Sequence, residues 1–269
     1  MISAAIAALA LAATPCTLPP LGSGPRPWRA GESLAWDVDV MGIATAGTIE
    51  TTVDAPAAGV VPVRVRVKNT SVFAKVRHIR GVATSWIDAT TLLPRRYRDE
   101  TVEENGRRTT EVRFDDRGPH LRLAWTFNDR RGIREVDRTG VAMDLVSLVY
   151  YLRAAELKPG QRFCADLVAN RRYWRLEGTV AETREPVDTP AGTFQTIRVD
   201  TMLTRQPTPD DPKVRSRPLH LWLSDDTRRV PVAGVTEVDL GPVRALLSRG
   251  AGSRAAPGDG RSGHRSPAR

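Results

Sequence analysis

The sequence has few of the residues on which most catalytic and metal sites depend. Its 269 residues include only 2 cysteines and 4 histidines, and no CxxC or HExxH spacing groups them into a metal-binding pattern. Only 4 of the 40 basic residues are Lys. No apolar run reaches the roughly 18 residues of a transmembrane helix. These absences argue against a zinc site and against a membrane-spanning helix.

Motifs for common chemistries are also missing. The sequence contains no GxSxG elbow, no P-loop and no dinucleotide fingerprint. The adjacent carboxylates Asp115-Asp116 and Asp225-Asp226 both fall among turn-forming residues. Asp in a turn accepts hydrogen bonds from nearby backbone amides and needs no catalytic role. We therefore expect no enzyme, no cofactor and no metal ion.

The two ends of the chain differ in composition from its centre. Residues 1–13 contain the apolar run Ile2–Ala13 and the small-residue pattern Ala10-Leu11-Ala12, typical of a cleaved signal peptide. A Pro/Gly-rich lead-in covers 14–30, a single domain 31–248, and a basic tail, expected to be disordered, 249–269. We expect export to the periplasm or cell envelope.

An oxidising compartment would favour a disulfide between Cys16 and Cys164, which are the two cysteines of the chain. The net charge of +9 is inflated by the tail, which has five Arg and one Asp. The remaining charge is typical of a solvated surface, so we predict no nucleic-acid partner. Contact with an acidic envelope surface stays open, as does the oligomeric state.

Alternating apolar and polar residues predict strands with one buried face. In VVPVRVRVKN (60–69), every second residue from Val61 to Val67 is Val, and the alternate positions include Arg64, Arg66 and, after Val67, Lys68. These three cations are expected on the outer, solvated face.

Turn residues divide the strands. Asn105-Gly106 suits a two-residue hairpin turn that would place Glu104 opposite Arg107, and TPAG (189–192) suits another. In LHLWLSDDTRRVPV (219–232), the cluster SDDT predicts a turn, with the returning strand beginning at 227–229.

One segment has helical periodicity. Residues 143–157 repeat apolar side chains at helical spacing, Asp144 is suited to cap the N-terminus, and Lys158-Pro159-Gly160 ends the pattern. We expect this helix, from about Asp144 to Ala155, to pack on the sheet. A second, shorter helical piece is expected near 72–77.

Several stretches together resemble the bacterial family called domain of unknown function 3108. They are GESLAWDVDV (31–40), WIDATTLLPRRY (86–97), DLVSLVYYLRAAELKPGQRF (144–163), VDTPAGTFQTIRV (187–199) and LHLWLSDDTRRVPV (219–232). The likeness extends over about 31–247. It implies an exported or envelope-associated protein and transfers no catalytic residue, because no activity is established for the family.

The expected fold is mainly β, a strongly curved antiparallel sheet or half-barrel with one packed helix, similar to envelope lipoprotein carriers. A closed lipocalin-like barrel is the alternative. Such a sheet can leave an apolar cavity for a lipid or amphiphilic ligand. Candidate ligand-binding aromatics are Trp36, Trp86, Trp125, Tyr150 and Trp222. The alternative function is a structural or scaffold protein that contacts acidic polysaccharide or an envelope partner.

Overall fold

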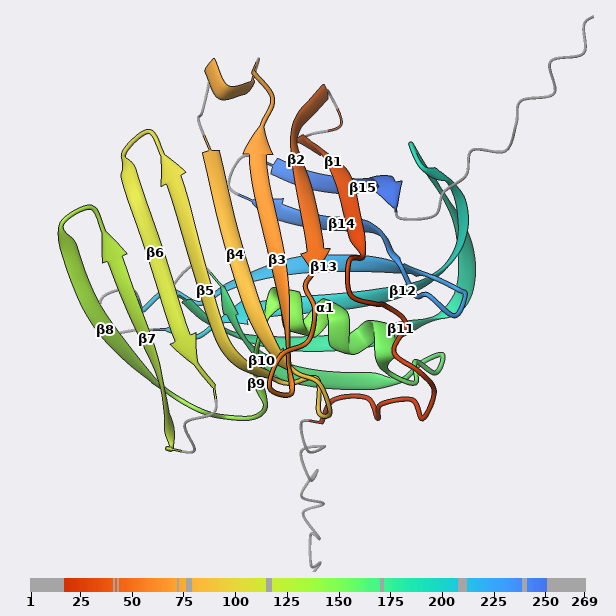
Figure 1. Cartoon of the computed structure of the whole chain (residues 1–269), viewed down its shortest axis with the longest axis horizontal. Helices are drawn as coiled ribbons and strands as arrows, with labels where there is room; N and C mark the ends of the chain where they lie inside the picture. Colours follow the sequence, from red (N-terminus) through yellow and green to blue (C-terminus); the bar gives the residue numbers. More distant parts are fainter. Residues whose placement is uncertain are drawn as a thin grey trace, which may run out of the picture.

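The computed structural model describes residues 17–40, 42, 44–71, 73–75, 79–114, 118–169, 172–207, 212–238 and 241–250. These ranges hold fifteen strands, one α-helix and one short 3₁₀ helix (Figure 1). The strands are β1 (Ser33–Val40), β2 (Ala44–Val53), β3 (Val60–Asn69), β4 (Ile79–Asp88), β5 (Pro94–Glu103), β6 (Gly106–Arg113), β7 (His120–Phe127), β8 (Arg130–Asp137), β9 (Ala142–Asp144), β10 (Arg162–Ala169), β11 (Arg172–Thr189), β12 (Gly192–Arg205), β13 (Arg215–Ser224), β14 (Pro231–Val238) and β15 (Gly241–Gly250). The helices are α1 (Leu145–Ala154) and the 3₁₀ helix Phe73–Lys75.

All fifteen strands belong to one sheet, in the order β8-β7-β6-β5-β4-β3-β2-β1-β15-β14-β13-β12-β11-β10-β9. Neighbours are antiparallel except β9 and β10, which are parallel. The chain therefore runs outward from β1 to one end of the sheet, crosses to the other end at β9, and returns to β1 through β15. The sheet curls back on itself, but β8 and β9 do not pair. The predicted curved open sheet is confirmed, and the closed-barrel alternative is wrong.

Helix α1 lies within the curve of the sheet (Figure 1). Its buried residues Leu148 and Leu152 belong to one apolar cluster with Val63 of β3, Ile87 of β4 and Leu223 of β13. The helix thus fills part of the concave side and joins strands from both halves of the sheet. The predicted helix is confirmed, with Asp144 as its N-cap.

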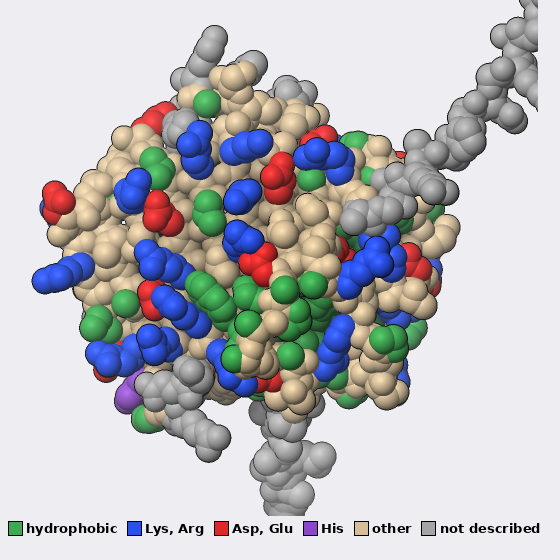
Figure 2. Space-filling view, in the orientation of Figure 1, with side chains coloured by type: hydrophobic (Ala, Val, Ile, Leu, Met, Phe, Trp, Pro, Cys, Tyr) green, Lys and Arg blue, Asp and Glu red, His purple; other side chains and the backbone are tan. Residues whose placement is uncertain are grey.

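Strand β3 shows how the sequence selects the two faces. Val61 and Val63 are buried on the concave side, whereas Arg64, Arg66 and Lys68 are exposed on the opposite, convex side. The period of two places alternate residues on opposite faces, as the sequence predicted for these cations. On the face drawn in Figure 2, Lys and Arg are interspersed with Asp and Glu.

The predicted turn at TPAG is confirmed, because Thr189 pairs with Gly192. The hairpin at Asn105-Gly106 has a different register from the one predicted. Glu103 pairs with Gly106, so the turn residues are Glu104 and Asn105. Asn128 of the next hairpin stabilises this register, since its Oδ1 accepts from Arg107 N at 2.9 Å and its Nδ2 donates to Asn105 O at 3.2 Å.

The SDDT cluster is a turn, as predicted, but the returning strand starts later than expected. Strand β14 begins at Pro231, and the carboxylate of Asp226 holds the preceding residues in the turn. One of its oxygens accepts from the backbone N–H groups of Arg228 at 2.9 Å and Arg229 at 3.0 Å. Asp225 instead pairs with Arg184 at 2.9 Å. The two adjacent carboxylates therefore serve separate structural contacts.

The ends of the chain are only partly described. The predicted signal peptide, 1–13, and most of the predicted tail lie outside the described residues, although β15 extends to Gly250, two residues past the predicted end of the domain at 248. The described lead-in, 17–30, runs beside α1, where Leu21 bridges to Ala155. The 3₁₀ helix Phe73–Lys75 lies within the short helical piece predicted at 72–77.

Asp88, at the end of β4, organises the turn into β5. Its carboxylate accepts from the backbone N–H of Thr91 at 2.8 Å and of Thr90 at 3.0 Å, and it pairs with Arg95 at 2.5 Å. These contacts lower the pKa of Asp88 from 3.8 to about 2. The hydrogen bond from the Thr91 N–H has the largest effect and the one from Arg95 the second largest. A lowered folded-state pKa means that this stabilisation is present above the unfolded value and lost as pH falls toward the folded one.

We expect Asp88→Asn to remove part of the acid sensitivity of the fold. Urea unfolding between about pH 4 and about pH 2 measures it. The wild type should lose stability through this window more steeply than the variant, because only in the wild type does unfolding lead to proton uptake at residue 88. Equal slopes in the two proteins would contradict this role of Asp88.

Candidate functional site

Beyond α1, the concave face of the sheet continues as an apolar surface that solvent partly reaches. On β3, Val65 and Val67 follow buried Val63 on the same face, and on β13 Leu221 and Leu219 precede buried Leu223. All four are half-buried. Strand β15 continues this surface with Val243 and Ala245, also half-buried. These six residues, here called the concave apolar surface, lie on both halves of the curled sheet.

The concave face becomes polar toward β5–β7. Asp99 of β5 shares this face with Tyr97, and it pairs across the strands with Thr110. Burial raises the pKa of Asp99, although Tyr97, Thr110 and Arg108 favour its charged form. Arg108 of β6 pairs with Glu103 at 3.1 Å. We call Asp99, Glu103, Arg108 and Thr110 the polar wall.

Trp125 lies at the polar wall. It pairs with Thr110 across β6 and β7 and is on the same face as the buried Leu121 and Leu123. Gly132 on β8 pairs with Trp125, and a Cβ added at Gly132 would lie 2.7 Å from the indole ring. The absence of a side chain at Gly132 therefore leaves room for the half-buried ring over β8.

A buried ion pair anchors α1 to the start of the sheet. Arg153 donates to the two carboxylate oxygens of Glu32 at 2.6 and 3.0 Å, and the two side chains are 0% and 5% exposed. The guanidinium also donates to Arg228 O at 3.2 Å and lies over the rings of Trp28 and Tyr150, 5.3 and 4.9 Å from their centroids. A charge this deeply buried is tolerated because it is paired and hydrogen-bonded.

Asp144 joins the other end of α1 to β4. Its carboxylate accepts from Ser147 N at 3.0 Å, which caps the helix, and from Ser85 Oγ at 2.7 Å. The side chain is fully buried, and desolvation raises its pKa despite these hydrogen bonds. Burial also raises the pKa of neighbouring Tyr97, and the carboxylates of Asp99 and Asp144 add to the shift.

The five aromatic residues predicted to bind a ligand do not come together. Trp36 is buried and donates from Nε1 to Pro231 O at 2.8 Å, and Tyr150 is buried beside Arg153. Trp86 and Trp222 lie on the convex side, Trp86 against Arg96 and Trp222 in a hydrogen bond to Glu185. Only Trp125 of the five combines the concave face with partial exposure.

Trp222 belongs to a network of paired charges on the convex face. Arg198 contacts Glu185 at 3.2 Å and Asp200 at 3.1 Å, and Asp200 accepts a 2.6 Å contact from His220 Nδ1. Each charge has an opposite partner across neighbouring strands, as in ordinary sheet surfaces. The network explains these side chains without a reacting group.

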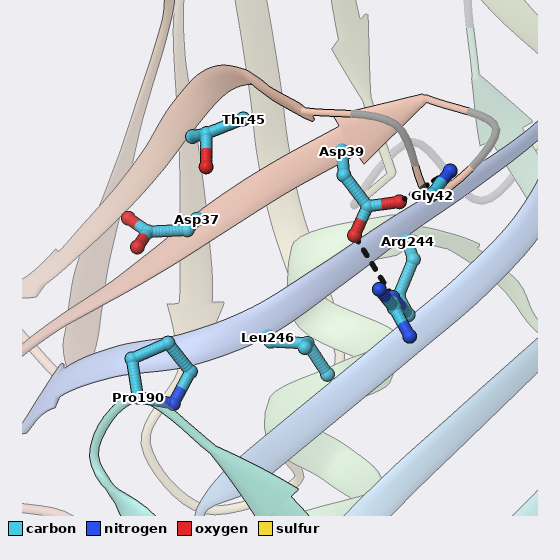
Figure 3. Close-up of a pocket in the computed structure, with 7 residues that line it drawn as sticks. All are labelled: Asp37, Asp39, Gly42, Thr45, Pro190, Arg244 and Leu246. Atoms are coloured by element: carbon cyan, nitrogen blue, oxygen red, sulfur yellow. Dashed lines mark hydrogen bonds and ion pairs between the residues drawn. The ribbon is translucent and has the colours of Figure 1, made fainter.

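A surface pocket of about 250 Å³ lies against β1 and β15 (Figure 3). Asp37 and Asp39 of β1, Arg244 and Leu246 of β15, and Pro190 from the β11–β12 turn line it, together with Gly42 and Thr45. Arg244 pairs with Asp39 at 2.8 Å, and Gly42 N donates to Asp39 at 3.0 Å. The pocket is small, charged and partly neutralised, so it is unsuited to an acyl chain.

The described part of the chain contains no group of three or more His, Cys, Asp or Glu side chains that could hold a metal ion. Cys16 lies outside the described residues, and so does His78. Cys164 N donates to Thr17 O at 3.1 Å. The residue after Cys16 therefore lies beside Cys164, and the predicted disulfide stays a prediction.

Intact-mass measurement of protein produced in an oxidising compartment tests the disulfide. We expect both thiols to resist alkylation until a reductant is added, because Thr17 keeps the chain next to Cys164. Cys164→Ser is the control and should leave one thiol alkylatable without reductant. Two alkylatable thiols in the unreduced wild type would refute the pairing.

Sequence reasoning missed the polar wall and the buried Glu32–Arg153 pair. The wall combines residues from β5 and β6 whose concave orientation depends on the register of the whole sheet. The pair joins residues 121 positions apart. A weak signal existed for Arg153, a charged residue in the last turn of an otherwise apolar helix.

Within the described ranges, no helix has the length and apolar character that crossing a membrane requires. A family model described as a protein of unknown function (DUF3108) matches residues 35–248. No curated protein matches the sequence.

Three solved structures match this chain to different degrees. A β-barrel-like DUF1849 protein from Brucella abortus has 10% identity and a TM-score of 0.53, over 81% of this chain and 96% of that one. A protein provisionally described as a lipoprotein, from Parabacteroides distasonis, has 10% identity and a TM-score of 0.35, over 83% and 96%. One provisionally described as exported, with a YmcC-like fold, from Bacteroides fragilis, has 11% identity and a TM-score of 0.33, over 89% and 100%. At these identities the first supports the fold alone.

Proposed function

The chain belongs to the DUF3108 family of unknown function, and we propose that it is an exported envelope protein that binds a lipid or other amphiphile on its concave face. The observation that carries the proposal is the concave apolar surface. Its six residues continue the apolar pattern of three strands past the region that α1 covers.

Covering this surface with an acyl chain is favourable. Half-exposed aliphatic side chains release free energy when they leave water, at about 25 cal/mol per Å² of apolar area. A curved sheet surrounds a ligand from two sides, and ligand sites in proteins are commonly concave and mostly apolar. Helix α1 already covers one end of the concave face. The acyl chain of the ligand would therefore lie at the other end, on the concave apolar surface.

The polar wall suits the head group of such a ligand. Arg108 and Glu103 offer a donor and an acceptor. Trp125, which pairs with Thr110 on the next strand, presents an apolar ring and its polar N–H over β8. Tryptophan is favoured where an apolar and a wet environment meet. A ligand with one apolar and one polar end therefore matches the two parts of the concave face.

Export is the second part of the proposal. The support is the apolar run Ile2–Ala13 followed by small residues, the pattern of a cleaved signal peptide. We also propose that binding is non-catalytic, since the carboxylates Asp225 and Asp226 and the base His220 each have a structural partner.

A scaffold role is the rival proposal. Its support is the exposed row Arg64, Arg66 and Lys68 on the convex face of β3, which an acidic polysaccharide or protein could contact. The two proposals involve opposite faces of the sheet. Substitutions on one face or the other therefore distinguish them.

Val67→Lys is expected to weaken the binding of a fluorescent fatty acid by at least about tenfold, because it places a charge where the acyl chain lies. Fluorescence titration measures the change. The matched control is Val82→Lys on β4, which has the same chemical change on the convex face, where Val82 is 44% exposed. Equal affinities of the two variants, or no binding by the wild type, would favour the scaffold.

A further inference from the structure

We propose that the free edge of β8 pairs with β8 of a second copy of this chain, forming a two-fold symmetric dimer centred on Ile133. Strand β8 is one end of the sheet and has no strand beyond it in the described part of the chain. It is eight residues long and forms the outer edge of the sheet in Figure 1. A long unpaired edge is a template for another strand.

The backbone of β8 presents alternate residues to that edge. Arg138 N donates to Pro119 O at 3.0 Å, so the polar backbone groups of residue 138 point toward the β7 side. The β7–β8 ladder has no register shift, and backbone direction alternates along a strand. The N–H and C=O groups of Arg131, Ile133 and Glu135 therefore point away from β7, toward the free edge.

The convex side chains of β8 are complementary to themselves. In an antiparallel pair centred on Ile133, each Arg131 lies opposite Glu135 of the second copy, and the two Ile133 side chains meet. Ile133 is 58% exposed, and opposite charges on facing residues stabilise strand pairs. Glu135 also contacts Arg122 at 3.1 Å, but both side chains are more than half exposed, so its second oxygen can accept from Arg131.

Neighbouring registers place like charges opposite each other. Centring the pair on Gly132 would set Arg130 against Arg134, and centring it on Arg134 would set that residue against itself. Like charges directly opposite are destabilising. In the register centred on Ile133, the only like charges that face each other are Asp129 and Asp137, at the exposed ends of the paired strands. Asp137 already contacts His120 at 2.8 Å. The sequence of β8 thus favours one register.

The mature full chain tests the proposal in sedimentation equilibrium. We expect a concentration-dependent dimer for the wild type and a monomer for Ile133→Pro. Proline at this position removes an N–H that points to the free edge and leaves the ladder to β7 intact. Circular dichroism should therefore show the wild-type strand content in the variant.

Charge exchange tests the register. Arg131→Glu and Glu135→Arg should each raise the dimer dissociation constant about tenfold, and the combined variant should restore it. The control is Arg66→Glu, which makes the same charge change at an exposed position of β3. It should leave the dimer dissociation constant unchanged. A monomeric wild type, or a dimer indifferent to both Ile133→Pro and Arg131→Glu, would overturn the proposal.

Discussion

Arg153→Ala is expected to lower the free energy of unfolding by about 3–5 kcal/mol. The variant leaves the carboxylate of Glu32, 5% exposed, without its cationic partner. It also removes the ring contacts to Trp28 and Tyr150 and the bond to Arg228 O. An uncompensated buried charge is among the costliest defects in a folded protein.

Urea unfolding measures this loss. The matched control is Arg64→Ala, which breaks an ion pair with Asp54 whose partners are 46% and 28% exposed. Such a surface pair contributes about 0–1 kcal/mol. If both substitutions cost the same, the lead-in and β1 are not held to α1 by the buried pair, and this account of the core is wrong.

Asp144→Ala is expected to lower the free energy of unfolding by about 1.5–5 kcal/mol. The loss of an N-cap costs about 0.5–2 kcal/mol, and the buried hydroxyl of Ser85 loses its acceptor, which costs about 1–3 kcal/mol. Since α1 fills part of the concave side, fraying of its first turn should also loosen the contact with β4. Thermal and urea unfolding together with helix content by circular dichroism measure the effect.

Asp144→Asn is the informative companion, because Asn also caps helices but does not titrate. Burial raises the folded-state pKa of Asp144, so its contribution to stability is present below the unfolded pKa and is lost as pH rises through the folded one. The wild type should therefore lose stability relative to Asp144→Asn as pH rises above about 4. A pH-independent difference would contradict a raised pKa at this residue.

The sequence predicts the strands and the helix well because their signals are local. The alternation in VVPVRVRVKN defines both faces of β3, and Asp144 caps α1 as its position suggests. Turn residues such as Pro190 and Gly192 also act locally. Each of these features depends on a few neighbouring residues, so no knowledge of the sheet is needed.

The site depends on contacts that are distant in sequence. Trp86 and Trp125 both lie in predicted strands, yet Trp86 is on the convex face and Trp125 on the concave one. The face of each depends on the register of its strand within the whole sheet. The hairpin at Asn105 adopts its register through Asn128 of the next hairpin. Strands β8 and β9 end the sheet and do not pair, so the sheet stays open. This too depends on the arrangement of all the strands and not on any local stretch of sequence.

Native mass spectrometry of the exported protein, purified without detergent, tests the central claim most directly. We expect a co-purifying amphiphile on the wild type, retained by Val82→Lys and lost from Val67→Lys, because Val67 lies on the concave apolar surface and Val82 on the convex face. Wild-type protein that carries no amphiphile and acquires none from added lipid would contradict it.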